Sequence, residues 1–174
     1  MAGGSNRWNV DAGLLIVRVG IGAAFIAYGW PKLMAGAEMW EKVGQAVQSL
    51  GLTRPFFGVE LKPEFWGCVA SFVETVGGVM IVLGFLFRPF ALLLFLEMAV
   101  ATQWVVSQGS SFYPVQDQVT GFWKQLGWAH PAEMCVLFLA LVFTGPGRVT
   151  LIELAKMSKK GGKGGGGGGG GGSK

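Results

Sequence analysis

The sequence predicts an all-α, polytopic membrane protein: an antiparallel bundle of four transmembrane helices with a short interfacial helix in the first long loop. Hydrophobic residues make up 51% of the 174-residue chain and charged residues only 14%, whereas soluble domains carry about 25% charged residues. Four apolar runs approach the length of about 20 residues that spans a bilayer. Because lipid offers no partner to backbone polar groups, helices are the expected spanning form.

Each predicted span corresponds to one apolar run. The first covers Ala12–Trp30, the second Phe65–Phe87, the third begins at Pro89 and ends near Val106, and the fourth runs over Pro131–Gly145. Only residues 87–89 join the second run to the third. This short connection predicts a tight antiparallel hairpin.

The two long connections have different compositions. Residues 38–50 carry apolar side chains at helical spacing opposite a polar face, which predicts an amphipathic helix on the membrane surface; these are Met39, Val43, Ala46, Val47 and Leu50. The connection from Ser107 to His130 is rich in aromatic residues typical of an interfacial belt, namely Phe112, Tyr113, Phe122, Trp123 and Trp128.

Residues 1–158 are therefore predicted to form one membrane domain, and residues 159–174 a flexible tether rich in lysine and glycine. The first helix lacks a convincing cleavage site after it, so we expect it to be retained. Lysine and arginine are more numerous on the side of both termini, which predicts cytoplasmic termini. The net charge of +4 then reflects topology and attraction to lipid headgroups, and no nucleic-acid partner is expected.

Ionisable residues inside the apolar runs form the candidate site. Arg18, Glu74 and Glu97 lie well within predicted spans, where a charge costs about 2.5–3.5 kcal/mol. From the helical rise of about 1.5 Å per residue, we expect Arg18 to reach Glu97, Glu74 or both. Lys32 and Glu133 are expected to pair near the outer boundary. The charges would either lock the bundle together or form a working polar cavity, such as a quinone headgroup site or a proton path.

Small residues accompany these charges. The first span carries one stripe of residues spaced four, three, four and three apart: Arg18, Gly22, Phe25, Gly29 and Lys32. On the second span, Glu74, Gly77 and Gly84 share a face. The glycines predict close approach of neighbouring helices.

Several cofactor classes are excluded by composition. His130 is the only histidine, and Cys68 and Cys135 are isolated from each other, so two-histidine haem ligation or an iron–sulfur cluster held within this chain is not expected. No dinucleotide or phosphate-binding glycine motif is present. We therefore expect no metal and no covalently bound cofactor. Any redox role would use a diffusible quinone or the cofactor of a partner.

Three segments, in order, resemble the DoxX family. The first span is similar to the family's opening Arg…Gly…His-Gly-x-x-Lys pattern, with Tyr28 at the position where histidine is common. Residues 72–84 are similar to its Glu…Gly-Gly…Leu-Gly signature. Residues 144–151 are similar to its closing Gly-Pro-Gly-Arg-x-Ser-Leu segment, with Thr150 in place of serine and Glu153 near the usual aspartate.

The resemblance implies a four-helix membrane bundle with a link to respiratory chemistry, since the related DoxD is a subunit of a thiosulfate:quinone oxidoreductase. We therefore expect a small bacterial inner-membrane subunit of a quinone-linked respiratory or sulfur-oxidising complex. The expected catalytic residues are Glu74 and Arg18, and the expected quinone pocket consists of Arg18, Lys32, Glu74 and Glu97. Arg18 and Lys32 would orient an anionic quinone, and the glutamates would exchange protons.

Two other functions stay open. The chain could be a non-catalytic subunit that anchors other membrane or soluble subunits of a larger complex, as the aromatic connection and the glycine tether suggest. A small-molecule transporter is the third alternative. Four helices leave only a narrow path, and the inverted repeat that transporters often show is not evident.

Overall fold

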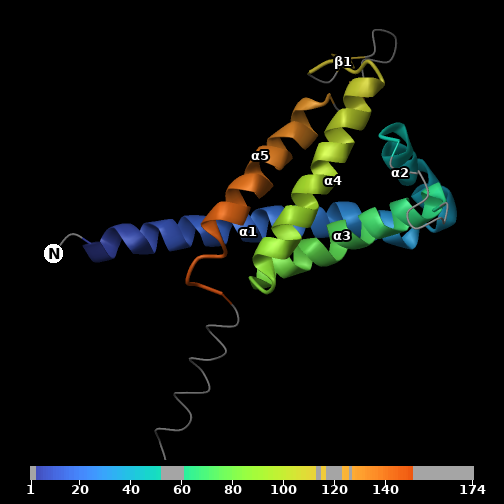
Figure 1. The fold of residues 1–174 in the computed structure, drawn as a ribbon. Helices are drawn as coiled ribbons and strands as arrows, with labels where there is room; N and C mark the ends of the chain where they lie inside the picture. Colours follow the sequence, from blue (N-terminus) through green and yellow to red (C-terminus); the bar gives the residue numbers. More distant parts are fainter. Residues whose placement is uncertain (1–2, 52–60, 113–114, 117–122, 126, 151–174) are drawn as a thin grey trace, which may run out of the picture.

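The described part of the chain is helical apart from one short pair of strands (Figure 1). The structure, a computed structural model, describes residues 3–51, 61–112, 115–116, 123–125 and 127–150. The elements in chain order are α1 (Gly3–Met34), α2 (Ala37–Ser49), α3 (Pro63–Leu83), α4 (Phe87–Ser107), β1 (Val115–Gln116), β2 (Trp123–Gln125) and α5 (Ala129–Thr144). Helix α1 packs along α3, α2 packs on α3, and α4 packs along α5. The α4–α5 pair crosses the α1–α3 pair at an angle (Figure 1).

The apolar helices confirm the all-helical membrane class. Within the described residues, three helical segments are long and apolar enough to cross a membrane: Trp8–Met34 of α1, Pro63–Leu83 and Phe87–Ser107. The fourth predicted span is α5, an apolar helix of 16 residues. At about 1.5 Å per residue it is about 24 Å long, shorter than a hydrocarbon core of about 30 Å. The four-span bundle therefore stays a prediction.

The hairpin turn between α3 and α4 lies earlier than predicted. It occupies residues 84–86 rather than 87–89. Gly84 ends α3 in a left-handed conformation, with φ of 71°, and its N–H donates to the Met80 carbonyl at 2.9 Å. Pro89 lies in the first turn of α4, where the backbone N–H groups have no partner within the helix. The prediction that the helix begins only at Pro89 was therefore wrong, since α4 begins at Phe87.

The first helix also extends beyond its predicted end. It continues through Pro31 to Met34, although proline removes one backbone hydrogen bond inside a helix. The predicted amphipathic helix is confirmed as α2, and its place on the membrane surface stays a prediction.

Part of the second connection is described. Strands β1 and β2 pair antiparallel, and the Phe112 and Trp128 rings pack edge to face with centroids 4.6 Å apart. The other predicted belt side chains, Tyr113, Phe122 and Trp123, and the predicted tether lie outside the described residues and side chains.

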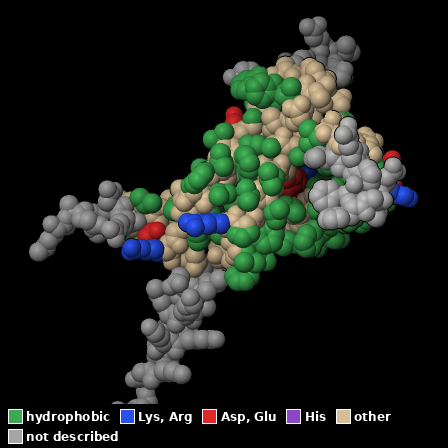
Figure 2. Space-filling model, in the orientation of Figure 1, with side chains coloured by type: hydrophobic (Ala, Val, Ile, Leu, Met, Phe, Trp, Pro, Cys, Tyr) green, Lys and Arg blue, Asp and Glu red, His purple; other side chains and the backbone are tan. Residues whose placement is uncertain are grey.

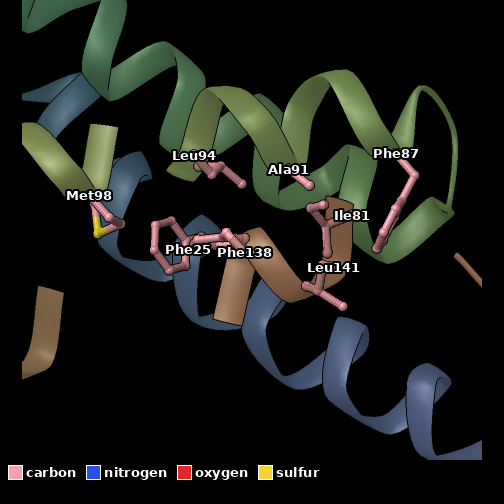
Figure 3. Close-up of a cluster of buried hydrophobic side chains, with 8 residues drawn as sticks. All are labelled: Phe25, Ile81, Phe87, Ala91, Leu94, Met98, Phe138 and Leu141. Carbon is pink, nitrogen blue, oxygen red and sulfur yellow. The ribbon is translucent and has the colours of Figure 1, made fainter. Parts of the chain in front are cut away.

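The hydrophobic core lies where the two helix pairs cross. Figure 3 shows its eight buried side chains, which come from α1, α3, α4 and α5: Phe25, Ile81, Phe87, Ala91, Leu94, Met98, Phe138 and Leu141. The Phe25 and Phe138 rings meet edge to face with centroids 4.8 Å apart. Outside this core many large apolar side chains are exposed, as at Ile16 and Phe143. Helices that are apolar around their whole circumference are suited to a lipid environment.

Glycines set the separation of α1 and α3. A Cβ atom placed on Gly22 would lie 2.6 Å from the Gly78 carbonyl oxygen, and one on Gly78 would lie 2.7 Å from the Gly22 carbonyl oxygen. A Cβ on Gly29 would lie 2.7 Å from the backbone nitrogen of Thr75. The predicted close approach at the glycine stripe is therefore confirmed. These contacts also place the charged side chains of the two helices relative to each other.

Candidate functional site

An ion pair joins α1 to α3 in the interior of the helix packing. Lys32 Nζ donates to both carboxylate oxygens of Glu74, at 2.6 and 2.7 Å. The Glu74 side chain is 6% exposed and the Lys32 side chain 33%. Gly29 packs directly against the Cβ of Glu74. Because helical side chains point back toward the helix N-terminus, Lys32, three residues further along α1, reaches Glu74.

Glu97 brings a second carboxyl group to this pair from α4. It interacts electrostatically with both Glu74 and Lys32, and it lies within hydrogen-bonding range of Glu74. Its Oε2 atom is buried and has no hydrogen-bond partner among the described residues. We call Lys32, Glu74 and Glu97 the polar cluster. Figure 2 shows a recess between hydrophobic side chains with acidic atoms at its floor and basic atoms beside them.

The polar cluster holds two carboxyl groups for one ammonium group. Lys32 balances the charge of Glu74, so the second carboxyl is without a counter-charge in apolar surroundings. Two neighbouring carboxyl groups repel each other when both are ionised, and one proton held between them removes that repulsion. The cluster therefore has the groups needed to hold a proton and to bind a polar headgroup.

Arg18 does not join this cluster. Its side chain is fully buried, at 1% exposure. Nη1 donates to the Pro146 carbonyl at 2.8 Å, and Nη2 donates to the Val149 carbonyl. The expected pairing of Arg18 with Glu97 or Glu74 is therefore wrong.

Helix geometry explains this correction. Gly29 is the residue of α1 that lies against Glu74. Arg18 precedes Gly29 by eleven residues, which correspond to about 16 Å along the helix. The Arg18 side chain also points toward the N-terminal end of α1, away from the cluster.

Arg18 instead connects α1 to the segment after α5 and to the α3–α4 turn. A Cβ on Gly84 of this turn would lie 3.0 Å from Arg18 Nη1. The same end of α1 supplies Asp11, whose Oδ1 accepts a hydrogen bond of 3.1 Å from the Arg148 backbone N–H. Sequence reasoning missed both attachments. The available signal was the Gly-Pro-Gly turn of residues 145–147, which has no helix or sheet to satisfy its carbonyl groups.

Other predicted partners also differ from the structure. Lys32 pairs with Glu74 rather than with Glu133, which is exposed on α5. Cys68 and Cys135 are free thiols. Tyr28, where the DoxX resemblance leads one to expect histidine, lies beside the His130 ring with centroids 6.3 Å apart. Within the described residues, no group of three or more His, Cys, Asp or Glu side chains is placed to hold a metal ion.

Comparison with known proteins places this chain in a family. The DoxX sequence model matches residues 13–107, more than half of the chain. The chain belongs to the DoxX family. The match contains the whole polar cluster, whereas the carbonyl groups bound by Arg18 lie outside it. Among curated proteins, the DoxX chain is similar to the inner membrane protein YphA of Escherichia coli strain K12, at 29% identity over 143 residues, covering 79% of this chain and 86% of YphA. No solved structure matches the chain significantly.

Proposed function

We propose that this DoxX protein is a small inner-membrane subunit of a quinone-linked respiratory or sulfur-oxidising oxidoreductase complex, with both termini in the cytoplasm. The observation that carries the proposal is the polar cluster, in which Glu97 presents a buried oxygen without a partner among the described residues. Ionisable groups within membrane helices are costly and mark functional sites by default. The similarity to an Escherichia coli protein named as an inner membrane protein supports the location.

In this proposal each residue of the cluster has a separate role. Lys32 orients the quinone headgroup and stabilises negative charge on it, since its side chain is one-third exposed and its ammonium group has three N–H donors. Glu74 holds Lys32 in place and, together with Glu97, accepts or supplies protons. Arg18 stands about 16 Å away along α1. It therefore supports the fold, and the sequence-based expectation of a catalytic, headgroup-binding Arg18 is not carried forward.

An anchoring subunit without chemistry of its own is the second candidate. Arg18 favours it, because this buried charge is bound by two backbone carbonyl groups and shows how a membrane charge can serve structure alone. The two candidates differ in what happens when the cluster is altered. An anchoring role requires only that the subunit fold and assemble.

The test combines lipid extraction with one substitution. The full-length protein is purified from its native membrane in mild detergent, and its lipid extract is analysed for quinone. Electron transfer to quinone is then measured in native membranes that carry Glu74→Gln, with Glu133→Gln as a control at an exposed glutamate. Quinone in the extract and a loss of electron transfer of at least tenfold in Glu74→Gln alone are expected. No quinone, together with unchanged electron transfer in assembled Glu74→Gln, would favour the anchoring role.

A further inference from the structure

The buried polar atoms without hydrogen-bond partners among the described residues include one on α3 and one on α4. Trp66, Ala70, Val73 and Gly77 form one stripe on α3, spaced four, three and four residues apart. Gly77 of this stripe packs against α4, because a Cβ on it would lie 3.2 Å from the Leu94 side chain. Trp66 Nε1, near the N-terminal end of α3, is buried and has no hydrogen-bond partner among the described residues.

Glu97 supplies the second such atom, Oε2, from α4. Its carboxyl group faces α3, since it interacts with Glu74. Buried polar atoms are nearly always hydrogen-bonded in folded proteins. We call the region between Glu74 and Glu97 the α3–α4 site, and the open oxygen of Glu97 indicates a place for a molecule that has a hydrogen-bond donor of its own.

The open hydrogen-bonding positions have a defined chemistry. A carboxylate oxygen accepts hydrogen bonds and donates none. Oε2 of Glu97, which has no partner among the described residues, is therefore an open acceptor. Lys32 has three N–H donors, and Glu74 takes two of them. The cluster thus offers one open acceptor, on Glu97, and one open donor, on Lys32.

We propose that the α3–α4 site binds the reduced, hydroxyl-bearing form of an aromatic headgroup, a hydroquinone, in preference to the quinone. A phenolic hydroxyl donates to Glu97 Oε2 and accepts from the third N–H of Lys32, so both open positions are filled. A quinone carbonyl only accepts, and it leaves the Glu97 oxygen without a donor. An unpaired buried acceptor weakens binding by about tenfold or more. This inference rests on the proposed function and specifies which redox form the site takes.

The experiment compares three probes of nearly the same shape: tetramethylhydroquinone, its dimethyl ether and tetramethylbenzoquinone. Equilibrium dialysis against the full-length protein in mild detergent, without oxygen, gives a Kd for each. The hydroquinone is expected to bind at least about tenfold more tightly than either other probe. Glu97→Leu is expected to remove this preference, and Glu97→Gln to retain it because its amide oxygen still accepts. Glu133→Gln, altered at an exposed glutamate, should match the wild type.

Each outcome decides between distinct conclusions. Equal or tighter binding of the quinone or the ether by the wild type overturns the inference, and so does a hydroquinone preference that persists in Glu97→Leu. If the quinone binds best and Glu97→Leu weakens it, the proposed function stands and only the redox preference fails. If no probe binds the wild-type protein, both fail. The wild-type comparison decides the inference even if Glu97→Leu does not fold.

Discussion

Replacing Lys32 with methionine should destabilise the protein in a way that depends on pH. Methionine keeps most of the length and apolar surface of lysine but removes the ammonium group. Glu74, only 6% exposed, then loses both hydrogen bonds from Nζ. Its carboxyl group is left beside that of Glu97 with no counter-charge in the polar cluster.

Two limits set the size of this effect. Breaking a buried ion pair by removing one partner costs about 3–5 kcal/mol. The stranded carboxylate can instead take up a proton, which from a reference pKa of about 4.3 costs about 3.7 kcal/mol at pH 7 and about 1 kcal/mol at pH 5. Because Lys32 is one-third exposed, we expect a loss in the free energy of unfolding of about 2–4 kcal/mol at pH 7. Proton uptake should limit the loss to about 1 kcal/mol at pH 5.

The assay is reversible unfolding in mixed micelles of dodecylmaltoside and SDS, followed by circular dichroism between pH 5 and pH 8. Lys42→Met is the matched control, because Lys42 forms an exposed ion pair with Glu38 at 2.9 Å, and its stability should not change measurably. Adding Glu74→Leu to Lys32→Met removes the stranded carboxyl group and should restore most of the loss. The reasoning is refuted if Lys32→Met matches the wild type at pH 7, or if its loss is the same at pH 5 and pH 8.

Three further predictions concern other parts of the molecule. Arg18→Met removes two charge-assisted hydrogen bonds to the segment after α5, so it should lower the free energy of unfolding by about 2–4 kcal/mol in the same assay. It should also speed proteolysis of that segment, and unchanged proteolysis would contradict this role. Gly29→Val forces a Cβ into the Thr75 backbone and should cost at least about 1–3 kcal/mol, whereas Gly20→Val, at a glycine with nothing within 4 Å, should be nearly neutral in that assay. The hydrogen bond between Glu38 and Lys42 lowers the pKa of Glu38 and raises that of Lys42, so the pair should break as pH falls through the first value or rises through the second. NMR titration in 0.5 M salt should move both values back toward those of free side chains.

Local patterns in the sequence were enough to predict the helices and the glycine contacts. The apolar runs determine where helices form in lipid, and small residues at helical spacing determine where α1 and α3 come together. Gly22 and Gly29 show this directly, since both lie against backbone atoms of α3. The hairpin turn was misplaced because Pro89 was taken as a break, although the first turn of a helix tolerates proline.

The partners of the buried charges were not predictable from depth alone. Depth estimates treat each helix as standing upright and each side chain as level with its own Cα. In the structure the α4–α5 pair crosses the α1–α3 pair (Figure 1), and long side chains extend toward the N-terminus of their helix. The crossing changes the position of Glu97 relative to α1. The side-chain direction moves Arg18 away from Glu74 and brings Lys32 to it. The depth estimates lacked the register of α1 relative to α3, which the packing of Gly29 against Thr75 sets.

Burial of a charge does not by itself distinguish a functional residue from a structural one in this protein. Arg18 is the more deeply buried charge, yet two carbonyl groups accept its hydrogen bonds, and those bonds account for its place in the fold. Arg18 Nε and Glu97 Oε2 are both buried without a hydrogen-bond partner among the described residues. Glu97 differs because no backbone group of the described residues takes up its charge, whereas two carbonyl groups take up that of Arg18. If Glu97 had only a structural role, leucine could replace it. The protein would then no longer bear the free-energy cost of desolvating a buried carboxyl group. If Glu97→Leu is more stable than the wild type and yet fails to support electron transfer, the site has retained Glu97 for chemistry at the expense of stability.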